Sequence, residues 1–301
     1  MNPQVLITEV GPRDGLQSVA AVMPTAAKCA WIDALAASGL REIEVASFVP
    51  PRLLPQMADA AEVVRHALRH SHWTVLALVP NRRGAEAALA AGVHKLTLPV
   101  SASEAHSMAN VRKTCAGMLD ELRAVVALRD DRAPGVVVEA AISTAFGCTL
   151  QGAVDEDHVI RMAVQAAEAG AAEVALADTT GMANPVQVRR LFSRLRAELG
   201  ARAGAAHLHN TRGLGLANAL AAWDVGVRAF DASLAGLGGC PFAPGATGNV
   251  VTEDLVWMFE AMGVRTGIDW PRLVAARAPL AAGLPGEPLY GLSAAQEAVH
   301  V

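Results

Sequence analysis

The chain alternates between two kinds of segment along most of its 301 residues. Short runs rich in β-branched and other apolar residues are each followed by a longer alanine-rich segment with helical periodicity. Strands are predicted at residues 5–10, 42–47, 74–79, 95–100, 136–142, 173–177, 205–208 and 229–234. Helices are predicted at 25–38, 56–70, 82–91, 104–129, 155–169, 185–199, 215–225 and 253–262. Eight strand–helix units are typical of the TIM (β/α)8 barrel, the α/β fold that we predict.

Proline and glycine positions agree with this division. Pro24-Thr25 and Asn184-Pro185 are helix-start signals, and an alanine–glycine step closes the predicted helices before residues 93 and 171. The main rival is a doubly wound open sheet. That fold usually carries a glycine-rich phosphate-binding turn after its first strand, and the segment Gly11-Pro12-Arg13-Asp14-Gly15 is not such a turn.

No linker divides the chain, so we predict one catalytic barrel domain over residues 1–301, with 265–301 as a C-terminal extension. A further amphipathic segment is predicted near 271–282, followed by a tail rich in glycine and proline. This tail is expected to cover part of the barrel or an oligomer interface, or to be mobile. We expect a homo-oligomer, either a dimer or a tetramer.

Composition and charge exclude several classes of protein. The net charge of −4 is spread along the chain without a basic run, so we expect no nucleic-acid partner. Acidic residues interrupt the apolar segments before they reach transmembrane length, and residues 1–4 lack the features of a signal peptide. The four cysteines lie far apart without a C-x-x-C pair, which predicts free thiols in the cytoplasm rather than disulfides.

Polar residues follow the predicted strands at their carboxyl ends, where TIM-barrel active sites are built. They are Glu9, Arg13, Asp14, Glu44, Ser47, Asn81, Ser101, Ser143, Thr144, Asp178, Thr179, His207, His209 and the segment 236–249. Polar side chains scattered through a core would not favour one end of every strand. The pattern therefore predicts a functional site at that end of the barrel.

The most specific part of this pattern is His207-x-His209. Side chains alternate along a strand, so both imidazoles lie on one face and suit a divalent metal. Asp14 and Asn249 could add the oxygen ligands that Mg²⁺ or Mn²⁺ prefers. The alternative is two unrelated strand histidines, one buried and one solvated.

Three further residues suit catalysis. Arg13 adjoins a candidate ligand and could stabilise an enolate or oxyanion, or could form only an ion pair with Glu9 or Glu44. Asp178 could act as a base or orient one, or could cap the next helix. Cys240 follows three glycines within five residues, which suits a mobile loop that carries an acid or base, or a turn with an incidental cysteine.

Three motifs resemble the 3-hydroxy-3-methylglutaryl-CoA lyase family of metal-dependent TIM-barrel lyases and synthases. They are Glu9-Val10-Gly11-Pro12-Arg13-Asp14-Gly15-Leu16-Gln17, the segment from Ser47-Phe48-Val49 through Pro55-Gln56-Met57, and Ser233-Leu234-Ala235-Gly236-Leu237-Gly238-Gly239-Cys240-Pro241-Phe242. The segment from Gly248-Asn249 to Glu253-Asp254 also matches. The resemblance runs from about residue 5 to about residue 269.

This resemblance implies cleavage of a 3-hydroxy-3-methylglutaryl-CoA-like thioester to acetyl-CoA and acetoacetate. It implies that Asp14, His207, His209 and Asn249 bind the metal and that Arg13 polarises the thioester oxygen. It also implies catalytic positions at Glu44, Asp178 and Cys240, a substrate-binding position at Gln17 and a supporting position at Glu253. His207 or Asp178 would be the base.

The chain departs from the family pattern at Ser18-Val19-Ala20, at Asn210, where many lyases have aspartate, and at Arg212. A histidine motif followed by asparagine is typical of the condensing synthases. We therefore keep two rivals beside the lyase: a Claisen-type acyltransferase similar to isopropylmalate or citramalate synthase, and a catalytically inactive barrel kept for binding. A lyase for a different acyl-CoA also remains open.

Overall fold

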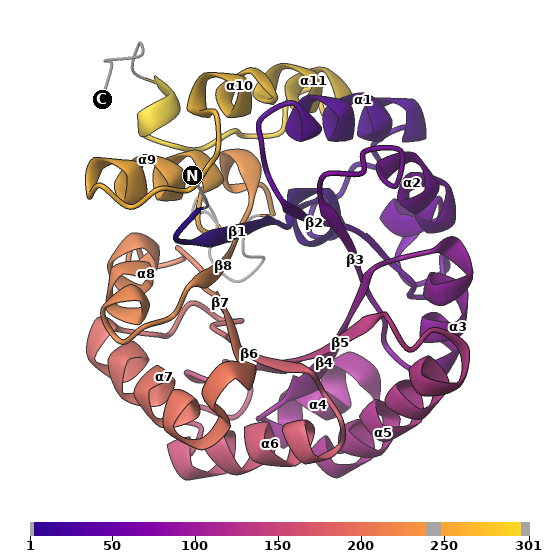
Figure 1. Ribbon diagram of the computed structural model, residues 1–301, viewed down its shortest axis with the longest axis vertical. Helices are drawn as coiled ribbons and strands as arrows, with labels where there is room; N and C mark the ends of the chain where they lie inside the picture. Colours follow the sequence, from indigo (N-terminus) through magenta and orange to yellow (C-terminus); the bar gives the residue numbers. More distant parts are fainter. Residues whose placement is uncertain (1–2, 239–247, 296–301) are drawn as a thin grey trace.

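Eight parallel strands form a closed barrel surrounded by a ring of helices in the computed structural model, which describes residues 3–238 and 248–295 (Figure 1). Each strand pairs with the next one along the chain, and β1 pairs with β8 to close the barrel. The predicted TIM barrel is confirmed. Its strands are β1 Leu6–Glu9, β2 Glu42–Ser47, β3 Thr74–Leu78, β4 Lys95–Ser101, β5 Val137–Ser143, β6 Glu173–Ala177, β7 Ala203–His207 and β8 Ala229–Ala232.

Helices cover the outside of the barrel, and apolar side chains fill the space between the two layers. The helices are α1 Thr25–Ala36, α2 Ala60–Ala67, α3 Arg82–Ala91, α4 Glu104–Val111, α5 Cys115–Arg132, α6 Glu156–Glu168, α7 Pro185–Leu199, α8 Gly215–Asp224, α9 Thr252–Ala261, α10 Trp270–Ala275 and α11 Arg277–Gly283. Asn184 caps α7 by accepting a hydrogen bond from the backbone of Gln187, as the Asn-Pro signal predicts.

Two predicted helices were wrong in extent. The predicted helix 104–129 is two helices, because Arg112 takes a left-handed conformation with φ 57° and ends α4. Thr114 then caps α5 by accepting from the backbone of Gly117. The predicted helix 56–70 is a short 3₁₀ turn, Pro55–Met57, followed by α2.

A short π-helix, Gly11–Gly15, follows β1 and was not predicted. The amide nitrogens of Arg13, Asp14 and Gly15 all donate to the carbonyl of Val10. This turn directs the Arg13 and Asp14 side chains over the carboxyl end of the barrel. Single π-turns of this kind are frequent at functional sites.

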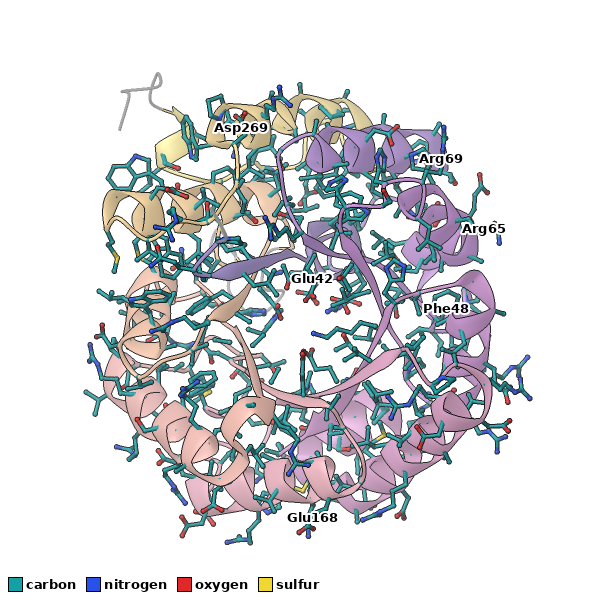
Figure 2. The ribbon with its side chains drawn as sticks, viewed as in Figure 1. Glu42, Phe48, Arg65, Arg69, Glu168 and Asp269 are labelled. Carbon is teal, nitrogen blue, oxygen red and sulfur yellow. The ribbon has the colours of Figure 1, made fainter. Side chains whose placement is uncertain are left out.

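The amino end of the barrel is filled by charge rather than by apolar side chains. Lys95 Nζ lies 2.8 Å from Glu139 Oε2, 2.7 Å from Glu173 Oε2 and 3.5 Å from Glu42 Oε1. Figure 2 shows Glu42 pointing into the barrel. The positive charge of Lys95 thus offsets part of the negative charge of these carboxylates. This charged group lies at the end of the barrel opposite the polar residues that follow the strands.

The segment after α9 packs back onto the ring, with α10 and α11 against α1 (Figure 1). Arg277 of α11 donates to the Glu253 carboxylate and to the carbonyl of Tyr290. No helix within residues 3–238 and 248–295 is both long and apolar enough to cross a membrane.

Candidate active site

Asp14, His207 and His209 come together at the carboxyl end of the barrel. Asp14 belongs to the π-helix after β1, His207 ends β7, and His209 pairs with Asn249 through an isolated bridge. The two imidazole Nε2 atoms are 3.2 Å apart, and His207 Nε2 lies 3.9 Å from Asp14 Oδ2. The side chains of Asp14 and His207 are 14% and 13% exposed, so the cluster is sheltered but open on one side.

The four predicted ligands fit a divalent cation. Six-coordinate bonds of about 2.1 Å place adjacent ligand atoms about 3 Å apart and opposite ones about 4.2 Å apart. The separations of 3.2 Å between the imidazole nitrogens and 3.9 Å between His207 and Asp14 fall within this range. Asn249 Nδ2 donates to Asp14 Oδ2 over 2.7 Å, while the buried Asn249 Oδ1 has no hydrogen-bond partner among the described residues. That oxygen and the facing imidazole nitrogens are the electron-pair donors that a cation requires.

The charge states suit the same conclusion. Burial would raise the pKa of Asp14, but Arg13, His207 and His209 hold it well below its usual range. Burial and the neighbouring His207 lower the pKa of His209 to about 4. At neutral pH the site therefore offers the Asp14 carboxylate and the neutral His209 imidazole, which are the ligand forms that bind metals. Burial lowers the pKa of His207, but Asp231 and Asp14 raise it overall, so His207 must release a proton when it binds a metal.

Arg13 is held between two carboxylates. Its Nε donates to Glu44 Oε2 over 2.7 Å, and its Nη1 pairs with Asp14. The predicted alternative of an ion pair with Glu44 is thus part of the structure. Because the guanidinium is buried and fixed from two sides, it presents its remaining N–H groups in a defined direction.

Asp178 follows β6 and is buried. Its Oδ1 accepts from the backbone nitrogens of Met182 and Ala183, and its own nitrogen donates to the carbonyl of His207. It therefore organises the loop before α7 but does not cap that helix, which Asn184 does. Burial raises the pKa of Asp178 to about 6, and Oδ2 has no partner among the described residues.

Gln17 contacts the ligand cluster directly, whereas Glu253 contacts the backbone of a neighbouring loop. Gln17 Nε2 donates to Asp14 Oδ1 over 2.9 Å, so it contacts a predicted ligand directly. Glu253 is buried beneath the site, where its two oxygens accept from the backbone nitrogen of Ala235. Ala235 adopts φ 58°, a left-handed conformation that a non-glycine residue needs such contacts to maintain.

Two acids, the half-buried Asp231 and the buried Glu9, were not assigned a catalytic role from the sequence. Asp231 Oδ2 lies 3.1 Å from His207 Nδ1 and fixes that nitrogen as the donor, so Nε2 faces the cluster. Glu9 accepts from the backbone nitrogens of Gly11 and Leu234 and from the Thr252 hydroxyl. Asp231 lies in β8 opposite His207 of β7. That its side chain points toward His207 can be inferred only when the register of these two strands is known, and the sequence does not give that register.

Cys240 lies outside the described residues. The other cysteines are free thiols, and Cys115 and Cys148 are buried. Burial, and then the contact with Glu104, raise the pKa of Cys115 to about 12, so that thiol is inert.

Two of the three departures from the family pattern, Asn210 and Arg212, have local explanations. Asn210 Oδ1 accepts from the backbone nitrogen of Gly215, which holds the turn before α8. Arg212 donates to the carbonyls of Thr180 and Gly181 at 3.1 and 2.6 Å, which ties this turn to the loop after β6. Asn210 thus has a structural role in this turn.

The family model described as HMGL-like matches residues 4–279. The (R)-citramalyl-CoA lyase of Chloroflexus aurantiacus is 44% identical over 96% of this chain and 93% of its own length. The hydroxymethylglutaryl-CoA lyase YngG of Bacillus subtilis is 41% identical over 91% of both chains. The solved structure of an HMG-CoA lyase from Acinetobacter baumannii, in complex with coenzyme A and 3-methylmalate, has TM-score 0.89 and 41% identity, covering 95% of this chain and 93% of that one.

Proposed function

Because the chain belongs to the HMGL-like family of lyases, we propose that it cleaves a 3-hydroxy-3-methyl acyl-CoA thioester by a retro-Claisen reaction. The observation that carries this proposal is the convergence of Asp14, His207 and His209 beside the fixed guanidinium of Arg13. Such an arrangement can acidify a hydroxyl and stabilise a developing oxyanion within one small volume.

We propose 3-hydroxy-3-methylglutaryl-CoA or the shorter citramalyl-CoA as the substrate, since relatives named for each are similarly close. The two thioesters share the tertiary alcohol and differ by one methylene before the terminal carboxylate. A single methylene in a binding pocket is worth about 10–200-fold in kcat/KM, so the preferred substrate should be clear in a direct comparison.

The metal would be held by Asp14, His207, His209 and the Asn249 side-chain oxygen. A divalent ion there, Mg²⁺ or Mn²⁺, would lower the pKa of the substrate hydroxyl. Gln17 and Asp231 act on the ligands: one donates to Asp14, and the other holds His207 in the required tautomer.

Asp178 is the base that we favour over His207. Both ring nitrogens of His207 are engaged, one by Asp231 and the other within the ligand cluster. Asp178 keeps one oxygen without a partner among the described residues, and its pKa of about 6 leaves it ionised at neutral pH. It would take the hydroxyl proton while the C2–C3 bond breaks to give a ketone and a thioester enolate.

Arg13 would stabilise the enolate oxygen, and Glu44 would keep the guanidinium in place. The Cys240 thiol would then protonate C2 of the enolate to give acetyl-CoA, and the thiolate would regain a proton from Asp178 or solvent. The role of Cys240 rests on its sequence motif alone.

The test is product identification. The purified enzyme, supplied with Mg²⁺ or Mn²⁺, is incubated separately with 3-hydroxy-3-methylglutaryl-CoA and with citramalyl-CoA, and the products are identified by mass spectrometry. We expect acetyl-CoA with acetoacetate from the first or with pyruvate from the second. Failure to cleave either, or acyl transfer from acetyl-CoA to an added 2-oxo acid as the only reaction, would overturn the lyase assignment.

The base assignment needs its own variant. Asp178→Asn should lower kcat by about 10²–10⁴-fold while metal content stays normal. Full activity of this variant would return the role to His207.

A further inference from the structure

A second group of metal-ligating side chains lies on the outside of the barrel, on α1 and α2. Asp33 of α1 meets His66 of α2 and His70 in the turn after that helix. Both imidazole Nε2 atoms lie 2.7 Å from the same oxygen, Asp33 Oδ1. Figure 1 shows α1 and α2 next to each other in the outer ring.

The convergence follows from the way the chain turns at the end of α2. His66 lies in the last turn of the helix, and the chain beyond Ala67 brings His70 to the same Asp33 oxygen. Their ring centroids are 6.3 Å apart, and one ligand atom from each of the three residues falls within 4.8 Å of the others. Arg65 and Arg69 alternate with the histidines but are exposed at the outer surface (Figure 2).

The group can open to admit an ion. Zinc bonds of about 2.0–2.1 Å place tetrahedral ligand atoms about 3.3 Å apart, so each nitrogen–oxygen separation must widen by roughly half an ångström. The Asp33 side chain is 50% exposed and can make that adjustment by rotation. The imidazoles are 16% and 28% exposed, so water can supply the remaining ligand.

The charges near the group are of both signs. Burial raises the pKa of the Cys29 thiol on α1, Asp33, Glu62 and Asp59 raise it further, and Lys28 opposes them. The last turns of both helices contribute the partial negative charge of their free carbonyl groups.

We propose that Asp33, His66 and His70 form a separate site for a first-row transition-metal ion such as Zn²⁺, which joins α1 to α2. Two imidazoles and one carboxylate, without a further oxygen ligand among the described residues such as Asn249 offers to the inner cluster, favour Zn²⁺ over Mg²⁺, which prefers oxygen ligands. The site is distinct from the cluster at the carboxyl end of the barrel, and it stabilises the fold without taking part in the reaction.

The test uses the Mg²⁺-loaded enzyme and Zn²⁺ as the probe. Bound zinc is counted by equilibrium dialysis and elemental analysis in the wild type, His70→Gln, Asp33→Asn and the control His72→Gln. His72 is exposed and its ring lies 6.2 Å from that of His70, but it is not part of the group. We expect His70→Gln and Asp33→Asn to bind one zinc ion fewer than the wild type, or to bind it at least tenfold more weakly, and His72→Gln to match the wild type.

Thermal unfolding provides a second readout. Zinc at about 100 times its dissociation constant should raise the Tm of the wild type by about 4 °C more than that of His70→Gln. Equal zinc content and equal Tm shifts in the wild type and both site variants would overturn the proposal. All of these proteins keep Asp14 and His209, so any zinc bound at the inner cluster is the same in each and cancels in the comparison. The result is therefore independent of whether the catalytic proposal holds.

Discussion

The barrel brings two histidines and an aspartate together both inside its mouth and on its outer surface. In the inner cluster His207 and His209 are two residues apart at a strand end, and in the outer one His66 and His70 are four apart at a helix end. In both clusters the two imidazoles converge on one aspartate. Spacing alone therefore cannot tell a catalytic site from a surface one.

The difference lies in what surrounds each cluster. Asp231 fixes the protonation of His207, and Arg13 and Asn249 contact Asp14, so the inner cluster is held in one arrangement. In the outer cluster the Asp33 side chain is half exposed and contacts only the two imidazoles among the hydrogen bonds of the described residues. The comparison indicates that a metal-binding cluster suits catalysis when buried, charged neighbours fix the orientation and protonation of its ligands. A cluster that faces solvent can bind a metal ion but has no such neighbours to act on a substrate.

The largest expected effect separates the two aspartates. Asp14→Ala should lose its Mg²⁺ or Mn²⁺, and turnover should fall by roughly four decades or more, because a metal supplies several kcal/mol of transition-state stabilisation. His209→Ala should behave in the same way. Asp33→Ala is the matched control and should keep full turnover. Normal metal content in Asp14→Ala, or an equal loss of turnover in Asp33→Ala, would remove the distinction between the clusters.

The second prediction tests whether the Cys240 thiol supplies a proton in the reaction at the inner cluster. Cys240→Ala should fold and bind metal but lose about 10²–10⁴-fold in turnover, which is the usual contribution of a general acid. A variant with Cys29, Cys115 and Cys148 replaced together should keep most of its activity. The assignment is wrong if that triple variant is inactive while Cys240→Ala is active.

The substitution Arg13→Lys tests whether turnover depends on the planar shape of the guanidinium as well as on its charge. Lysine keeps the positive charge but loses the planar group that contacts Glu44 and Asp14 at once. Turnover should fall by roughly two to three decades, as when one oxyanion donor is removed, with little change in metal content. Near-normal kcat would leave Arg13 with a structural role only.

The smallest expected effect concerns the support beneath the inner cluster. Burial raises the pKa of Glu9 to about 8, although its hydrogen bonds oppose this shift. Between about pH 5 and 8 the folded state therefore holds a proton that the unfolded state has lost, so Glu9 makes the protein less stable as pH rises. Relative to Glu9→Gln, the wild type should lose on the order of 1 kcal/mol per pH unit in this range, measured by urea unfolding. A difference that does not change with pH would contradict the raised pKa.

The repeating units and the end of the barrel that carries the polar residues could be predicted from the sequence. The periodicity of apolar residues distinguishes strands from helices within each short segment, and TIM barrels place their functional side chains at the carboxyl ends of the strands. The break at Arg112 could not be predicted, because an arginine in left-handed conformation has no sequence signature like that of glycine. The π-helix at Gly11–Gly15 was missed for a similar reason.

Contacts between distant segments account for the rest of what was missed. The partnership of Asp231 with His207 depends on the register of β7 and β8, and the Asp33 group depends on the packing of α1 on α2. Neither is visible in a local pattern. Asp14, His207, His209 and Asn249 could be predicted to lie together because the family motifs and the strand ends coincide there, whereas Cys240 lies outside the described residues.

The most direct test of the central claim is a single-turnover reaction with and without metal. Enzyme stripped by a chelator and enzyme resupplied with Mg²⁺ or Mn²⁺ are mixed with the preferred thioester, and acetyl-CoA is followed by mass spectrometry. The account predicts stoichiometric acetyl-CoA and the matching keto acid from the resupplied enzyme, and almost none from the stripped enzyme or from resupplied Asp14→Ala. Equal product from stripped and resupplied enzyme would contradict the claim that Asp14, His207 and His209 form the catalytic metal site.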